Sequence, residues 1–182
     1  MSDEDQQGRR RVDRILAEGF GDDLAALSLA ELHDRRDDCL NEREFLSYLR
    51  RLLQGRLEIL RAEQQRRADG VTDDRPIEQK LAEIFAQETP QAPGRGEALR
   101  VELPEEEMML ARRRIERVLN DSAFSDPASL NEDQVGAAIL TLAKEEREVS
   151  DLRRTVMDLM DGFQDEVKRR YTDQMIAEGL RG

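Results

Sequence analysis

The sequence of 182 residues has little of what an enzyme or a secreted protein needs. It contains one cysteine, Cys39, so no disulfide can form within the chain, which is typical of proteins in the reducing cytosol. Its one histidine, His33, lies in the charged stretch LHDRRDD, and we interpret it as an exposed helix residue. Cysteine and histidine clusters that bind zinc, glycine-rich phosphate loops and nucleophile motifs are missing. The sequence therefore predicts neither enzymatic activity nor a metal site.

Tryptophan is absent, aromatic residues make up only 4% of the chain, and no run approaches the roughly 20 apolar residues of a membrane span. The first residues, MSDEDQQGRRR, lack the apolar segment of a signal peptide. Charged residues reach 38%, and the formal net charge of −12 disfavours broad binding to nucleic acid or to an anionic membrane. We therefore expect a cytoplasmic protein without direct contacts to nucleic acid or membrane.

Two long stretches have the pattern of α-helices. The first begins at a Ser-x-x-Glu capping box over 28–31 and ends at Asp69-Gly70, a helix stop. The second begins at the same pattern over 129–132 and continues to about residue 171 or beyond. Apolar residues recur in both at steps of three and four, which keeps one apolar stripe on each helix. High charge also suits a disordered chain, but this periodicity favours helices.

These stretches predict an all-α fold, in which the two long helices form an antiparallel coiled-coil hairpin with short flanking helices. Along the chain we expect four parts: an N-terminal tail with a short helix (1–27), the first long helix (28–69), a linker with short helices (70–128), and the second long helix with the C-terminal tail (129–182). The short helices are expected over 10–18, 76–87 and 104–119. Arg36, Cys39 and Arg43 are expected to interrupt the apolar seam of the first long helix.

The two long helices look like copies of one element. Residues 46–67 align with residues 149–170 without gaps, and seven of the 22 positions are identical. The polar residues of each copy lie on one helical face, about 100° from the apolar stripe. In the first copy they are Ser47, Arg50, Gln54 and Glu58. In the second copy Ser150, Arg153 and Asp161 lie on this face together with the apolar Met157.

Guanine is one ligand that would use such a face. Arginine can donate two hydrogen bonds to the O6 and N7 edge of guanine, and a carboxylate can accept from the N1 and N2 protons. The alternatives are a solvated face with ordinary salt bridges, or a face that duplication kept without any ligand. The residues by themselves leave these alternatives open.

Over about residues 25–175 the chain resembles the actinobacterial anti-sigma factors of the RsiG type. The signature of that family is Glu-x3-Ser-x2-Arg-x3-Gln-x3-Asp, present once on each of two helices in an antiparallel coiled coil. The first copy here has Ser47, Arg50, Gln54 and Glu58, with Arg43 in place of the signature Glu. The second copy has Glu146, Ser150, Arg153 and Asp161, with Met157 in place of Gln.

The resemblance implies an anti-sigma factor that makes and breaks no bonds. It would sequester a sporulation sigma factor of the WhiG or flagellar type in a cyclic di-GMP-dependent manner, with cyclic di-GMP as a regulatory ligand and no metal. The implied ligand-binding residues are Ser47, Arg50, Gln54, Glu58, Glu146, Ser150, Arg153 and Asp161. Two alternatives stay open. The departures at Arg43 and Met157 suit an anti-sigma factor that acts without cyclic di-GMP, and the hairpin could also be a structural scaffold.

Overall fold

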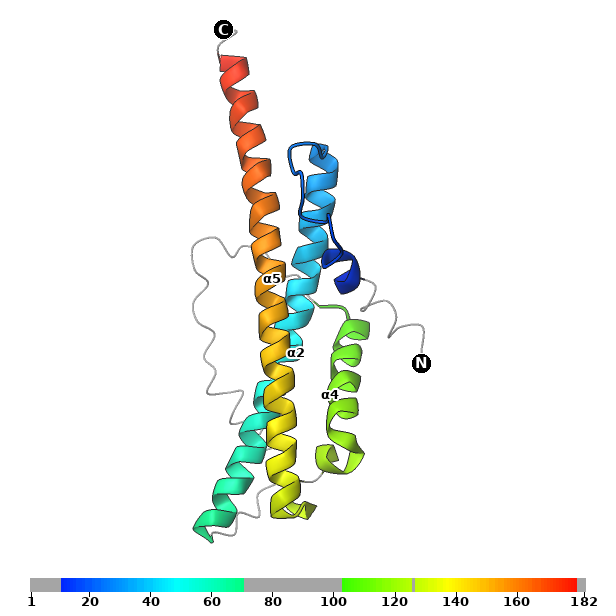
Figure 1. Ribbon diagram of the computed structural model, residues 1–182, viewed down its shortest axis with the longest axis vertical. Helices are drawn as coiled ribbons and strands as arrows, with labels where there is room; N and C mark the ends of the chain where they lie inside the picture. The colour runs from blue at the N-terminus through cyan, green and yellow to red at the C-terminus, as the bar shows by residue number, and fades with distance from the viewer. Residues whose placement is uncertain (1–10, 71–102, 126, 180–182) are drawn as a thin grey trace. The chain divides into compact units, whose positions relative to one another are not determined.

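A computed structural model of the chain describes residues 11–70, 103–125 and 127–179 (Figure 1). Apart from short turns these residues are helical, and no strand occurs among them, which confirms the all-α prediction. The elements are α2 (Leu29–Asp69), α4 (Glu105–Ser125), the 3-10 turn η1 (Pro127–Ser129) and α5 (Glu132–Gly179), preceded by a short helical segment over 11–15. The expected helix over 76–87 lies outside the described residues.

The predicted start and end of α2 are confirmed. Ser28 N donates to Glu31 Oε2 (2.7 Å), and Glu31 N donates to Ser28 Oγ (3.2 Å), which is the reciprocal bonding of a capping box. Gly70 follows the helix with a φ of 67°. This left-handed conformation is open to glycine and commonly ends a helix.

The predicted start of α5 at Ser129 is wrong. Ser129 belongs to η1, and the helix is capped two residues later, where Asn131 N donates to Gln134 Oε1 (2.8 Å) and Gln134 N donates to Asn131 Oδ1 (2.9 Å). Asn131 and Gln134 make the two bonds that Ser28 and Glu31 make in α2. Asn is as good an N-cap residue as Ser, so it can take this role. The helix runs on to Gly179, in agreement with the expectation that it continues to about residue 171 or beyond.

The expected end of the helix over 104–119 is wrong as well, because α4 continues to Ser125. The polar residues of 120–125 cost a helix less than about 1 kcal/mol each. The first residue that blocks a helix is Pro127, which lacks the backbone donor. Pro104 precedes α4 as predicted, and three glutamates fill the first turn of the helix.

The chain forms two compact units, whose described residues are 11–46 and 151–179 (unit 1) and 47–70, 103–125 and 127–150 (unit 2). Each unit contains part of α2 and part of α5. In unit 2, Arg50 contacts Glu146 on α5, whereas Arg67, further along α2, contacts Leu130 before α5 begins. Residue numbers therefore rise on α2 as they fall on α5, so the two helices are antiparallel.

The core positions of both long helices recur every seven residues, the spacing of a coiled coil. The side chains at these positions are at most 2% exposed: Leu32, Cys39, Leu46, Leu53 and Leu60 on α2, and Val135, Leu142, Val149, Val156 and Phe163 on α5. The expectation that Cys39 interrupts the seam is therefore wrong, since the thiol packs as a small apolar group. Burial, reinforced by the charges of Asp38 and Glu42, raises the pKa of Cys39 to about 12.

The two units repeat one another well beyond the 22 aligned residues. In unit 1, Arg170 donates to the carbonyls of Leu24, Ala25 and Leu27 (2.6–3.1 Å). In unit 2, Arg67 donates to the carbonyls of Pro127, Ala128 and Leu130 (2.7–3.3 Å). Corresponding residues of the two sets are 103 positions apart. We call each set an arginine latch, because it fastens one long helix to the segment that precedes the other.

The short helices repeat in the same way. Arg11 pairs with Glu42 in unit 1, and Arg114 of α4 pairs with Glu145 in unit 2, both at 2.7 Å. These residues are again 103 positions apart, and the flanking sequences RVDRIL (11–16) and RIERVL (114–119) correspond at every position. This match is visible in the sequence but lies outside the 22-residue alignment. Residues 11–70 and 114–173 therefore share one pattern with a single offset.

Candidate functional site

Unit 2 brings residues of both motif copies together around one carboxylate. Glu146 Oε1 accepts hydrogen bonds from Arg50 Nε (3.1 Å), Gln54 Nε2 (3.0 Å) and Ser150 Oγ (3.0 Å). Arg50 and Gln54 come from the first copy, on α2, and Glu146 and Ser150 from the second, on α5. We call these four residues the Glu146 network. Four of the eight predicted site residues thus meet in one place.

Helical geometry explains why these four residues meet. Arg50 and Gln54 lie four residues apart on α2, as do Glu146 and Ser150 on α5, so each pair occupies adjacent turns on one side of its helix. The seam residues Leu53 and Val149, each next in sequence to a network residue, are fully buried. Packing of the seam therefore sets the two polar faces against each other at its edge.

The network leaves hydrogen-bonding groups that a ligand could use. Arg50 is 39% exposed and donates to Glu146 through Nε, and no bond from either Nη group is found among the described residues. All three bonds to Glu146 end on Oε1, so Oε2 is left as an acceptor within the described part of the chain. An arginine fork can donate to O6 and N7 of a guanine, and a carboxylate oxygen beside it can accept from the N1 and N2 protons of the same base.

The other four predicted site residues do not join the Glu146 network. Ser47 is half-buried on α2 in unit 2, and Glu58 is exposed one turn beyond Gln54. Arg153 is half-buried and Asp161 exposed, both on the α5 segment of unit 1. Arg153 and Asp161 hold helical positions equivalent to those of Arg50 and Glu58 in the first copy.

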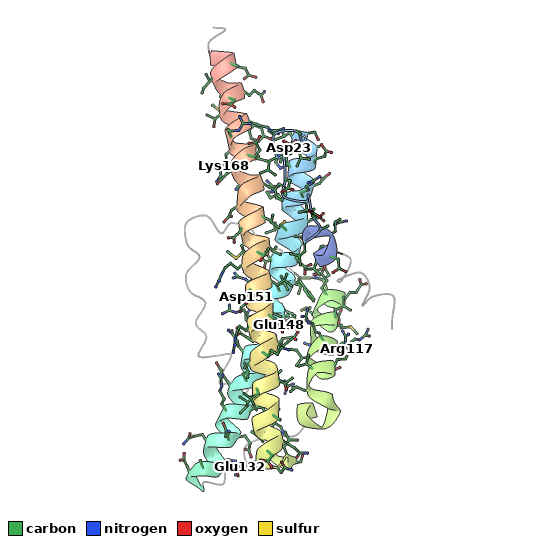
Figure 2. All side chains as sticks on the ribbon, in the orientation of Figure 1. Asp23, Arg117, Glu132, Glu148, Asp151 and Lys168 are labelled. Carbon is green, nitrogen blue, oxygen red and sulfur yellow. The ribbon has the colours of Figure 1, made fainter. Side chains whose placement is uncertain are left out.

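A third helix, which the motif does not predict, contacts the residue next to Glu146. Arg114 of α4 donates from Nε to Glu145 Oε1 (2.8 Å), and Glu145 directly precedes Glu146. Figure 2 labels Arg117 on α4 and Glu148 on α5, three residues beyond this ion pair on each helix. The three helices of unit 2 are therefore tied together by ion pairs at two consecutive glutamates. The match between RVDRIL and RIERVL was the available signal.

Other kinds of site find little support. In the described ranges, no group of histidine, cysteine, aspartate or glutamate side chains could hold a metal ion. His33 is half-buried rather than exposed, with its ring 6.4 Å from that of Tyr171 in unit 1. No described helix is long and apolar enough to cross a membrane.

Comparison with known families supports the resemblance seen in the sequence. Residues 18–85 match the family described as RsiG-like, a stretch that contains all of α2 and the first motif copy. The second copy, with Glu146 and Ser150, lies beyond the match. No curated protein matches the chain. The family indicates an anti-sigma role and, with it, a sigma factor as partner.

Proposed function

We propose that this RsiG-like chain is a cytoplasmic anti-sigma factor that binds cyclic di-GMP and sequesters a sporulation sigma factor of the WhiG or flagellar type. The observation that carries the proposal is the Glu146 network, because it joins signature residues of both copies in an arrangement that suits a guanine edge. The protein would act by binding alone.

The proposed ligand residues divide by their surroundings. Arg50, Gln54, Glu146 and Ser150 form the network, and Arg50 would use its Nη groups on guanine or phosphate. Ser47 and Glu58 extend the same face of α2. Arg153 and Asp161 are the corresponding candidates on α5 in unit 1.

Calorimetric titration of cyclic di-GMP into the purified chain, with and without a WhiG-type sigma factor, tests the proposal. We expect saturable binding that cyclic di-AMP does not reproduce, since adenine lacks the O6 acceptor and the N1 and N2 donors. Arg50→Ala should abolish it. Arg51→Ala is the matched control, because Arg51 is the next residue, carries the same charge and is exposed.

Each other outcome selects one of the alternatives. Capture of the sigma factor without any nucleotide binding would indicate an anti-sigma factor that acts independently of cyclic di-GMP. If neither the nucleotide nor the sigma factor bound, the proposal would be wrong and a structural scaffold would remain.

A further inference from the structure

Unit 1 contains a counterpart of the Glu146 network with different chemistry. The arginine latches, the Arg11–Glu42 and Arg114–Glu145 ion pairs and the helix caps all recur with an offset of 103. The same offset relates Glu146 to Arg43, Arg50 to Arg153, and Gln54 to Met157. The repeat therefore relates the pair Arg43 and Arg153 in unit 1 to the pair Glu146 and Arg50 in unit 2.

The residues that differ between the two units change which ligand each unit can bind. Unit 2 offers a carboxylate, a guanidinium and an amide, whereas unit 1 offers two guanidinium groups and a thioether. Arg43 is 16% exposed and donates to Glu44, its neighbour in the sequence, from Nε (3.1 Å) and from Nη2, which, among the described residues, leaves the Nη1 group for a ligand. The second copy has the opposite order, since Glu146 is followed by an exposed arginine, Arg147.

Two arginines in register across a helix pair favour an anion between them, because the attractions of both positive charges add. Phosphate oxygens suit this arrangement, because each guanidinium can donate two parallel hydrogen bonds to them. A guanine edge suits it less, because the carboxylate that would accept the N1 and N2 protons is missing at position 43. The carboxylate of Asp161 lies eight residues beyond Arg153, about 12 Å along the helix.

We propose that unit 1 carries a phosphate site formed by Arg43 and Arg153, whereas unit 2 carries the set that suits guanine. The site takes a phosphate group as a class, from a cyclic dinucleotide or from a simpler polyphosphate. This inference rests on the proposed function only where cyclic di-GMP is the source of the phosphate.

Inorganic pyrophosphate, which has no base, tests the site directly. We expect calorimetry to show pyrophosphate binding that Arg43→Gln or Arg153→Gln weakens by at least about tenfold, the effect of losing a charge-assisted hydrogen bond. Arg154→Gln is the matched control, because it removes the same charge from the exposed neighbour. Thermal unfolding checks that each variant folds.

The Arg43→Glu/Met157→Gln double variant gives unit 1 the residues of unit 2 and should lose pyrophosphate binding. If the wild-type chain binds no pyrophosphate, or if Arg154→Gln weakens binding as much as Arg153→Gln, the phosphate site is wrong. Cyclic di-GMP binding without pyrophosphate binding would overturn this site and keep the proposed function. Pyrophosphate binding at Arg43 and Arg153 without cyclic di-GMP binding would support this site and overturn the cyclic di-GMP part of the proposed function.

Discussion

Cys39 occupies the core position that leucine holds in the other copy, at Leu142, so its thiol reports on the packing of the seam. Its side chain is fully buried and its pKa is raised to about 12, chiefly by burial. At pH 8 we therefore expect almost no thiolate and very slow reaction with a disulfide reagent such as DTNB. The same reagent should label the denatured chain at once. Rapid labelling of the folded protein would contradict the buried position.

Glu63 and Glu166 are equivalent carboxylates that hold the two latch arginines. Glu63 accepts from Arg66 and Arg67, and Glu166 from Arg169 and Arg170. These bonds, first those from Arg66 and Arg169, lower the pKa of each carboxyl group from 4.5 to about 2. Because the folded-state pKa is lowered, the stabilisation is present above pH 4.5 and is lost as the pH falls towards 2.

We therefore expect Glu63→Gln to lower the melting temperature at pH 7 and to make little difference near pH 2. Thermal unfolding followed by circular dichroism between pH 7 and pH 2 measures this. Glu58→Gln is the control, because Glu58 is exposed and has no bonded partner among the described residues. A difference between wild type and Glu63→Gln that stayed constant with pH would show that the ionised carboxylate is not the cause.

At the scale of elements, the caps of α2 and α5 use different residues for the same bonds. Ser28→Ala and Asn131→Ala should each lower the free energy of unfolding by about 1 kcal/mol, because each leaves a backbone N–H of the first turn without its acceptor. Asn131→Asp keeps a side-chain acceptor and should retain most of the stability. Urea unfolding gives the values. An Asn131→Ala variant as stable as wild type would contradict the cap at Asn131.

The latches join elements that are distant in the sequence, so their loss should be felt locally. Arg67→Ala leaves three carbonyls of 127–130 without their donor, and Arg170→Ala does the same at 24–27. We expect faster amide hydrogen exchange around 127–135 in the first variant and around 24–32 in the second. Exchange that rises equally in both places for either variant would argue against two separate latches.

At the scale of the whole molecule, the sequence predicted the long helices because their apolar residues repeat over many turns. Helix boundaries are harder to predict where several polar residues can cap: Ser129 and Asn131 both fit the pattern, and the cap is at Asn131. The Glu146 network could be foreseen only as a face on each helix, since the pairing of Arg50 with Glu146 depends on the register between helices. The arginine latches could not be predicted, because their acceptors are backbone carbonyls, which have no signature in the sequence.

A ligand-controlled anti-sigma factor makes a thermodynamic prediction for the whole molecule. Cyclic di-GMP can raise the affinity for the sigma factor only if it binds the complex more tightly than the chain alone, and both ratios of affinities must then be equal. We expect calorimetry to give the same factor in both directions, in the range of about 5 to 150 that is typical of coupled sites. Arg50→Ala should reduce the factor to one while the sigma factor still binds. A sigma factor affinity that is unchanged by saturating cyclic di-GMP would mean that the ligand binds without control, because linkage leaves no other route for it to act.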